Sequence, residues 1–118
     1  MRIIKFRAWD KEEKEMLPVI TGMHIAMVFE NPKKFIPLQF TGLTDKNGKE
    51  IYEGDILKFM PSNVENPQFT IGVVHYSETD ARYKVDYWSF GTDVYFSNME
   101  IIGNIYENPN LLEEKREG

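Results

Sequence analysis

The sequence predicts an all-β, mostly antiparallel fold: a small, partly open β-barrel followed by a short C-terminal helix. Short apolar segments separated by turn residues run along nearly the whole chain, which is the order of elements in an antiparallel meander. Aromatic residues make up 14% of the chain, and with many Ile and Val residues they favour strands over helices. A sheet of this size avoids exposed edges most simply by curling into a barrel.

Length and composition limit the classes of protein to consider. With 118 residues, we expect a single domain over residues 1–118 with one hydrophobic core. The absence of cysteine excludes a disulfide scaffold, a thiol nucleophile and a Cys-ligated zinc, and it suits a reducing cytoplasm. No apolar run is long enough to span a membrane, and an N-terminus broken by Lys5 and Arg7 is not a signal peptide. The net charge of −5 disfavours a generic binder of duplex DNA.

The stretch Gln39–Phe59 carries the strongest local signals. At its centre, Asn47-Gly48 predicts a β-hairpin, because both residues tolerate the positive φ that a tight primed turn or a bulged turn demands. A second break follows at Gly54-Asp55, after an apolar pair and before a new strand. We therefore assign these four residues a structural role in turns.

The N-terminal part of the chain predicts a strand pair and a more ambiguous segment. Residues Ile4 to Ala8 alternate apolar with charged side chains and predict a half-exposed strand, with Met16 to Ile20 as its partner. Met23 to Phe29 is strongly apolar and fits either a strand or a short helix. Phe35 to Phe40 contains Pro37, which favours an edge strand or an irregular approach to the hairpin.

The C-terminal half predicts further strands and one helix. Asn108 suits a helix N-cap and Pro109 the first helical position, so residues 108–118 should form a short helix whose tail frays from Lys115. The expected strands are Phe69 to Tyr76, the alternating segment Tyr83 to Trp88, a short strand through Val94 and Phe96, and Ile101 to Tyr106.

Three blocks of sequence resemble the YopX family of phage and prophage proteins. They are K-F-R-A-W-D at Lys5–Asp10, F-T-G-L-T-D-K-N-G-K-E-I-Y-E-G-D-I at Phe40–Ile56 and I-G-N-I-Y-E-N-P at Ile102–Pro109, in the family's order. The stretches 16–37 and 60–99 carry no motif of the family. The resemblance implies a small β-rich, SH3-like barrel encoded by a phage or prophage, acting in the cytoplasm of the bacterial host. It implies no established activity. The bend at Ile51–Phe59 independently resembles one in SH3-like barrels.

No combination of residues predicts catalysis, a cofactor or a metal. Asp45-Lys46-Asn47-Gly48 places its glycine too early for a calcium loop and predicts a plain turn. Glu53 and Asp55 flank Gly54, where turn acids more often accept bonds from nearby backbone donors than act as an acid/base pair. His24 and His75 lack any metal-ligand spacing. The serines have no nucleophile-elbow glycines around them.

Aromatic residues provide the candidate binding surface. More rings occur here than one small barrel core easily absorbs, so strand alternation should point some outward, for example Tyr87 if Trp88 points inward. The competing interpretation is that the rings fill the core and its rim. The candidate binding residues are Trp9, Arg82, Tyr83, Lys84, Tyr87, Trp88 and Tyr95.

These observations favour a non-catalytic binding module whose partner is another protein or a second copy of the chain. The alternative is a nucleic-acid-associated regulator, because aromatic rings beside Arg82 and Lys84 suit stacking with single strands. Acidic neighbours such as Asp80 and Asp86 make that alternative the weaker one. An enzyme of unknown class ranks third.

Overall fold

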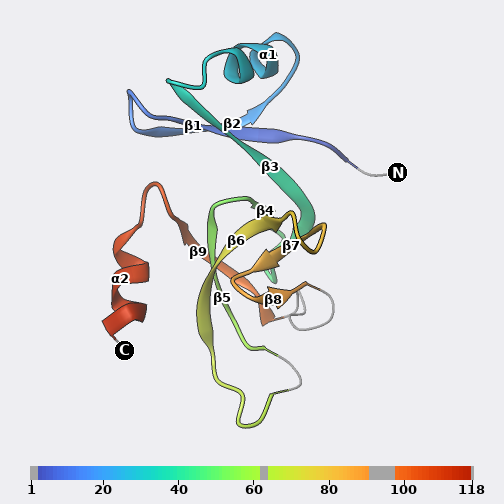
Figure 1. Ribbon diagram of the computed structural model, residues 1–118, viewed down its shortest axis with the longest axis vertical. Helices are drawn as coiled ribbons and strands as arrows, with labels where there is room; N and C mark the ends of the chain where they lie inside the picture. Colours follow the sequence, from blue (N-terminus) through green and yellow to red (C-terminus); the bar gives the residue numbers. More distant parts are fainter. Residues whose placement is uncertain (1–2, 62–63, 91–97, 118) are drawn as a thin grey trace.

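The computed structural model describes residues 3–61, 64–90 and 98–117, which form two layers (Figure 1). The elements are β1 (Phe6–Asp10), β2 (Glu15–Ile20), α1 (Met23–Glu30), β3 (Phe35–Thr44), β4 (Glu50–Tyr52), β5 (Asp55–Phe59), β6 (Thr70–Ser77), β7 (Arg82–Val85), β8 (Trp88–Ser89), β9 (Glu100–Asn104) and α2 (Asn110–Glu117).

The strands form two antiparallel sheets. The first has the order β2-β1-β3-β4, and the second has the order β8-β7-β6-β5-β9 and forms a half-barrel. Figure 1 shows β1, β2 and α1 in the upper layer and the half-barrel below, with β3 running from one to the other. The predicted all-β fold with a short C-terminal helix is confirmed.

Each layer has its own buried cluster, so the expectation of one core is wrong. The cluster of the upper layer contains Ala8, Ile20, Val28 and Phe35. The ambiguous segment 23–29 is helical; the helix places Val28 on the sheet and leaves Met23, Met27 and Phe29 exposed. The cluster of the half-barrel consists of Ile51, Leu57, Phe59, Val74, Val85 and Met99.

The layered arrangement also corrects the prediction for β1. This strand is covered on both faces instead of being half exposed, because Ala8 packs in the upper cluster while Trp9 stacks on Tyr106 at 5.5 Å between ring centroids. A one-layer barrel would have left one of these faces in water. The second layer is therefore the reason for the difference.

Pro37 lies in β3 at a position that tolerates its missing N–H. The N–H groups of Lys11 and Phe40 bond across to Lys34 and Lys5, so alternate residues of β3 face β1 and Pro37 faces the opposite side. In that part of the strand β4 is not yet paired, since the β3–β4 ladder begins at Phe40. The segment around Pro37 is thus an edge locally, as its sequence indicated.

The central hairpin is a four-residue turn with a glycine bulge. The Gly48 N–H donates to the Asp45 carbonyl at 3.0 Å, and Gly48 has φ +80°. Positive φ was expected at Asn47 too, but among the described residues only the glycine of this pair has it. A bulged turn needs one left-handed residue, whereas a primed two-residue turn needs both.

The second break, at Gly54, ties three strands together. Gly54 has φ +87°, its N–H donates to Val74 at 2.9 Å, and its carbonyl accepts the Ile105 N–H at 2.9 Å. A Cβ atom here would lie 2.9 Å from the Tyr106 ring. Both the backbone conformation and the close approach of Tyr106 therefore require glycine.

The C-terminal half differs from the prediction in one strand. The expected strand Tyr83 to Trp88 is broken into β7 and β8 by a turn at Asp86, which has φ +52°. The helix expected within residues 108–118 spans Asn110–Glu117, and fraying of its tail stays a prediction. The strand expected through Val94 and Phe96 falls outside the described residues.

Two sheet edges are closed by local features. On β2, the ladder to β1 carries a bulge beside Pro18, and proline has no N–H to offer a further strand. On β9, the N–H groups of Ile101 and Asn104 donate to side-chain oxygens of Asp45 and Asn108, at 3.0 and 3.1 Å. Side chains, and not another strand, therefore satisfy these donors.

Candidate functional site

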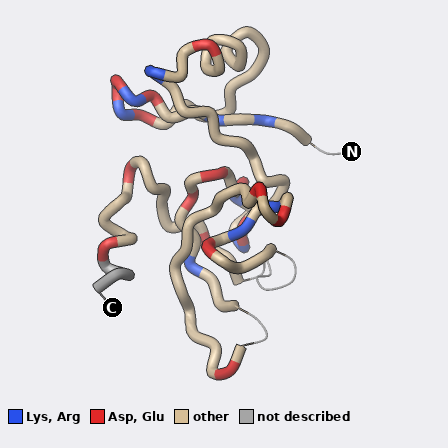
Figure 2. The backbone as a smooth tube through the Cα atoms, viewed as in Figure 1, with Lys and Arg blue, Asp and Glu red and all other residues tan. Residues whose placement is uncertain are grey.

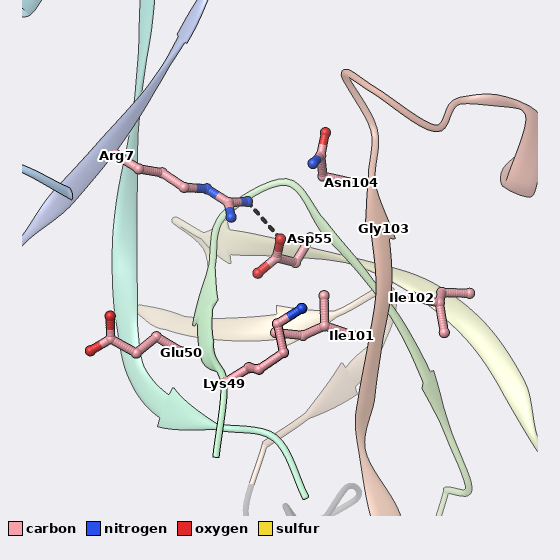
Figure 3. A pocket seen from close by; sticks show the side chains of 8 residues that line it. All are labelled: Arg7, Lys49, Glu50, Asp55, Ile101, Ile102, Gly103 and Asn104. Carbon is pink, nitrogen blue, oxygen red and sulfur yellow. Dashed lines mark hydrogen bonds and ion pairs between the residues drawn. The ribbon is translucent and has the colours of Figure 1, made fainter. Parts of the chain in front are cut away.

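A charged cleft lies where the two layers meet (Figure 3). It has two adjoining compartments, of about 250 and 370 Å³, which share Arg7, Lys49 and Glu50. The smaller compartment is completed by Asp55 and by successive residues of β9, Ile101, Ile102, Gly103 and Asn104. The larger is completed by Met16, Pro18, Val19 and Tyr52.

An ion pair between Arg7 and Asp55 forms the floor of the cleft. The Arg7 Nη2 atom donates to Asp55 Oδ1 at 2.6 Å, and the other carboxylate oxygen accepts the Tyr52 N–H at 2.8 Å. The Asp55 side chain is 2% exposed and that of Arg7 15%. The pair joins β1 to the start of β5 across 48 positions of sequence. The guanidinium also lies over the Tyr52 ring, 4.8 Å from its centroid.

Burial is the main influence on the pKa values of Asp55 and Tyr52 at the floor of the cleft. It raises the pKa of the Asp55 carboxyl above its ordinary value, although Arg7 and the Tyr52 N–H act in the opposite direction. Burial and the nearby Glu50 carboxylate raise the pKa of Tyr52 to about 12. The Tyr52 hydroxyl therefore keeps its proton at neutral pH and donates to Glu50 Oε1 at 3.2 Å.

The charged groups above the floor are unequally paired. Glu50 forms an ion pair with Lys5 and also accepts the Tyr52 hydroxyl, so its acceptors are occupied. Within the described residues, Lys49 has no ion-pair partner. Figure 3 shows its side chain reaching toward Ile101 and the Asp55 carboxylate, while Glu50 points away. Lys49 nevertheless acts to lower the pKa of the Asp45 and Asp55 carboxyls, so both acids are under the influence of its charge although neither forms an ion pair with it.

The predicted binding residues do not form one surface. Trp9 is buried between the layers, and Tyr95 falls outside the described residues. In the half-barrel, Trp88 packs against the buried cluster while Tyr87 is 83% exposed. Tyr83 packs edge-to-face on Tyr76 with ring centroids 5.2 Å apart.

The two basic residues of that set lie beside Tyr83. Arg82 is exposed, and the Lys84 ammonium is 2.7 Å from the Asp80 carboxylate. This pairing neutralises the charge of Lys84, so the segment presents less positive charge than its sequence indicates.

The candidate acid/base and metal residues have structural or separate positions. Glu53 Oε1 accepts the Gln39 N–H at 2.6 Å, so both acids flanking Gly54 hold backbone donors. His24 lies on α1 and His75 on β6. No cluster of three or more potential metal ligands occurs in the described ranges.

Sequence reasoning missed Arg7, Lys49 and Glu50 as parts of a site. Arg7 alternates with apolar residues and was interpreted as the solvent side of a strand. Lys49 and Glu50 follow a turn glycine and have the composition of a surface hairpin. One usable signal was present: Asp55 begins an apolar strand, and a buried carboxylate needs a cationic partner elsewhere in the chain.

The architecture of this chain is similar to that of a protein of known structure. A crystal structure of protein EF1440 from Enterococcus faecalis matches with a TM-score of 0.66 and 28% sequence identity, over 95% of this chain and 99% of that one. The search of curated proteins gave no match. No helix among the described residues is long and apolar enough to cross a membrane.

A family model supports the resemblance of this chain to the YopX family. The model of the YopX protein family matches residues 26–113, which include the central hairpin, the Gly54 bend, the half-barrel and the start of α2. The match covers well over half of the chain. The chain therefore belongs to the YopX family.

Proposed function

We propose that this protein is a non-catalytic binding module of phage or prophage origin, acting in the cytoplasm of the host bacterium. Its partner is another protein or a second copy of the chain. The observation that carries the proposal is the turn between β7 and β8, where the Tyr87 ring is 83% exposed. Exposed tyrosines are enriched at protein interfaces, because the ring offers apolar area and a hydroxyl with few rotatable bonds.

The backbone that presents Tyr87 is held in place by its neighbour Asp86. The Asp86 N–H donates to the Val73 carbonyl at 3.0 Å, and the Asp86 carboxylate accepts the Val73 N–H at 3.0 Å. The Asp86 carbonyl lies 2.7 Å from Nε2 of His75. An anchor fixed before binding loses less conformational entropy when the partner arrives, which favours a binding role for Tyr87.

The non-catalytic part of the proposal is supported by the state of two of the three acids that are buried in the described part of the chain. Asp45 and Asp55 each accept hydrogen bonds at both carboxylate oxygens. A general base needs a free lone pair directed at the substrate proton. Both carboxylates are instead used to hold backbone and Arg7 donors.

Binding to nucleic acid has less support than binding to protein. Lys84 is paired with Asp80, and basic residues are interspersed with acidic ones along the chain (Figure 2). Phosphate neutralisation requires a basic face. Salt-sensitive retention of the protein on single-stranded DNA or RNA would favour the nucleic-acid alternative over the proposal.

The test replaces Tyr87 and uses Phe69 as a matched control. Phe69 is 57% exposed on the segment before β6, so Phe69→Ala removes another exposed ring at a different place on the half-barrel. We expect Tyr87→Ala to weaken association by about 2 kcal/mol and to leave the melting temperature unchanged. Sedimentation measures self-association, and affinity capture from prophage-bearing cells with mass spectrometry compares partners across the wild type and both variants.

Two results would contradict the proposal. Equal association and equal partner sets in the wild type and Tyr87→Ala would remove Tyr87 from any interface. A lower melting temperature with unchanged association would instead show that the ring stabilises the fold.

A further inference from the structure

The cleft between the layers has the composition of a ligand site with two different halves. The smaller compartment is lined by Arg7, Lys49 and Asp55, and the larger by apolar residues of β2 together with Tyr52. The larger volume, about 370 Å³, lies at the lower end of the range for ligand pockets, and the smaller, about 250 Å³, lies just below that range. Because the compartments share Arg7, Lys49 and Glu50, one ligand can enter both.

The charged side chains that line the cleft balance one another. They are Arg7 and Lys49 on one side and Glu50 and Asp55 on the other. Lys5 lines neither compartment, but it pairs with Glu50. An added carboxylate would therefore enter a neutral cleft in a chain whose net charge is −5.

The hydrogen-bonding capacity of the cleft is what favours an acceptor. Guanidinium has five N–H donors, and in the described part of the protein only the Nη2 group of Arg7 reaches an acceptor, on Asp55. Lys49 adds an ammonium with no ion-pair partner among the described residues. The acids are already satisfied, by Tyr52 and Arg7 at Asp55 and by Lys5 and Tyr52 at Glu50. Donors are thus in excess.

The larger compartment indicates that the anion must also carry an apolar group. Met16, Pro18 and Val19 form an apolar wall on β2, partly exposed, opposite the Tyr52 ring. Burying an apolar side chain against this wall is favourable by about 25 cal/mol per Å² removed from water. A simple inorganic anion would leave the wall empty.

We propose that the cleft binds an apolar carboxylate, with the C-terminal residue of a partner polypeptide as its occupant. The free carboxylate lies between Lys49 and Arg7, and the apolar side chain lies against Met16, Pro18 and Val19. Four successive residues of β9, Ile101 to Asn104, line the smaller compartment and would contact the partner without strand pairing at Ile101 and Asn104, because these two N–H groups are already bonded. Capture of a terminal carboxylate is a recurrent mode of peptide recognition. The inference goes beyond the Tyr87 surface, since Tyr87 does not line this cleft.

The test is a titration of the isotope-labelled full chain, followed by amide chemical shifts. The probes are a short peptide ending in leucine, the same peptide with an amidated C-terminus, and N-acetyl-leucine. We expect saturable shifts at Tyr52 and at Ile101 to Asn104 with the free acid, and binding at least about tenfold weaker for the amide. The peptide acid should bind more tightly than N-acetyl-leucine.

Variants of two lysines on the same hairpin separate the cleft from general charge effects. Lys49→Met should weaken binding of the peptide acid at least as much as amidation does. Lys46→Met is the control, because Lys46 pairs with Glu100 at 3.5 Å and does not line the cleft. It should bind like the wild type.

Four outcomes would overturn the inference. These are equal binding of acid and amide, unchanged binding by Lys49→Met, shifts that map away from the cleft, and no shift up to the solubility limit. If N-acetyl-leucine bound and the peptide acid did not, the polypeptide occupant would be wrong. All of these readouts are independent of Tyr87.

Discussion

Asp45 is predicted to hold the central hairpin onto the half-barrel, and replacing it should be costly. Its carboxylate, on a residue 3% exposed, accepts the N–H groups of Asn47 and Lys49 at 2.9 Å each and of Ile101 at 3.0 Å. The Ile101 bond spans 56 positions and links the hairpin to β9. One side chain therefore joins the turn to a distant strand.

The magnitude follows from the exposure of the three donors. In a variant that lacks the Asp45 carboxylate, water can bond to the exposed N–H groups of Asn47 and Lys49. The N–H donor of Ile101 is partly buried and is less accessible to water. We expect Asp45→Ala to lower the free energy of unfolding by about 3 kcal/mol, since bonds to a charged group contribute about 1.5–3 kcal/mol when their donors stay dry. Asp45→Asn should cost less, about 1–2 kcal/mol, because it keeps one oxygen acceptor and turns an N–H₂ group toward Ile101.

The pH dependence gives an independent check. Burial acts to raise the pKa of Asp45, but the N–H bonds from Ile101, Lys49 and Asn47 outweigh it and lower the pKa. A lowered pKa in the folded state means that the stabilisation is present above the unfolded value of about 3.9 and is lost as the pH falls through the folded value. The difference between the wild type and Asp45→Asn should therefore shrink below about pH 4.

Urea unfolding followed by tryptophan fluorescence, at neutral and acidic pH, measures these differences. Asp80→Asn is the control, because Asp80 also has a lowered pKa but lies at the surface with Lys84 as its partner. It should leave the midpoint nearly unchanged. A cost below about 1 kcal/mol for Asp45→Ala, or a gap that persists in acid, would refute the proposed role of the carboxylate.

Two further predictions concern the turn and metals. Gly48→Val should destabilise the protein by about 1–3 kcal/mol, because Gly48 has φ +80° and open space around it, so the cost is backbone strain alone. Gly48→Asn should cost much less, and equal urea midpoints for glycine and valine would show that the turn is assigned wrongly. Neither zinc nor calcium in modest excess should raise the melting temperature, whereas a saturable rise would reveal a site, since a ligand of the folded state must stabilise it.

Local sequence signals were sufficient to predict much of the half-barrel. Gly48 and Gly54 mark turns whose backbone conformation few other residues adopt, and the apolar strand after Asp55 lies in the core. Pro37 correctly marked a stretch of strand with one open side. In these cases the cause of the structure lies within a few residues of the signal.

The cleft was not predictable in the same way, because its parts are remote in sequence. The pairing of Arg7 with Asp55 depends on how the upper layer sits over the half-barrel, which periodicity does not encode. Likewise, Trp9 was assigned to an outer surface because a second buried cluster was not expected. Asp45 looked like an ordinary turn acid, and only the approach of β9 gives it a third donor.

Two sheet edges, at β2 and β9, are closed to the pairing of a further strand, and this limits how a partner can bind there. Incoming strands extend a sheet only where backbone donors point into solvent. At β9 the donors of Ile101 and Asn104 are taken by Asp45 and Asn108, and at β2 the bulge and Pro18 interrupt the ladder. Strand addition at either place would first have to displace these bonds. Recognition at these two edges is thereby directed to side chains, and the same blocks oppose the growth of intermolecular sheets that leads to aggregation.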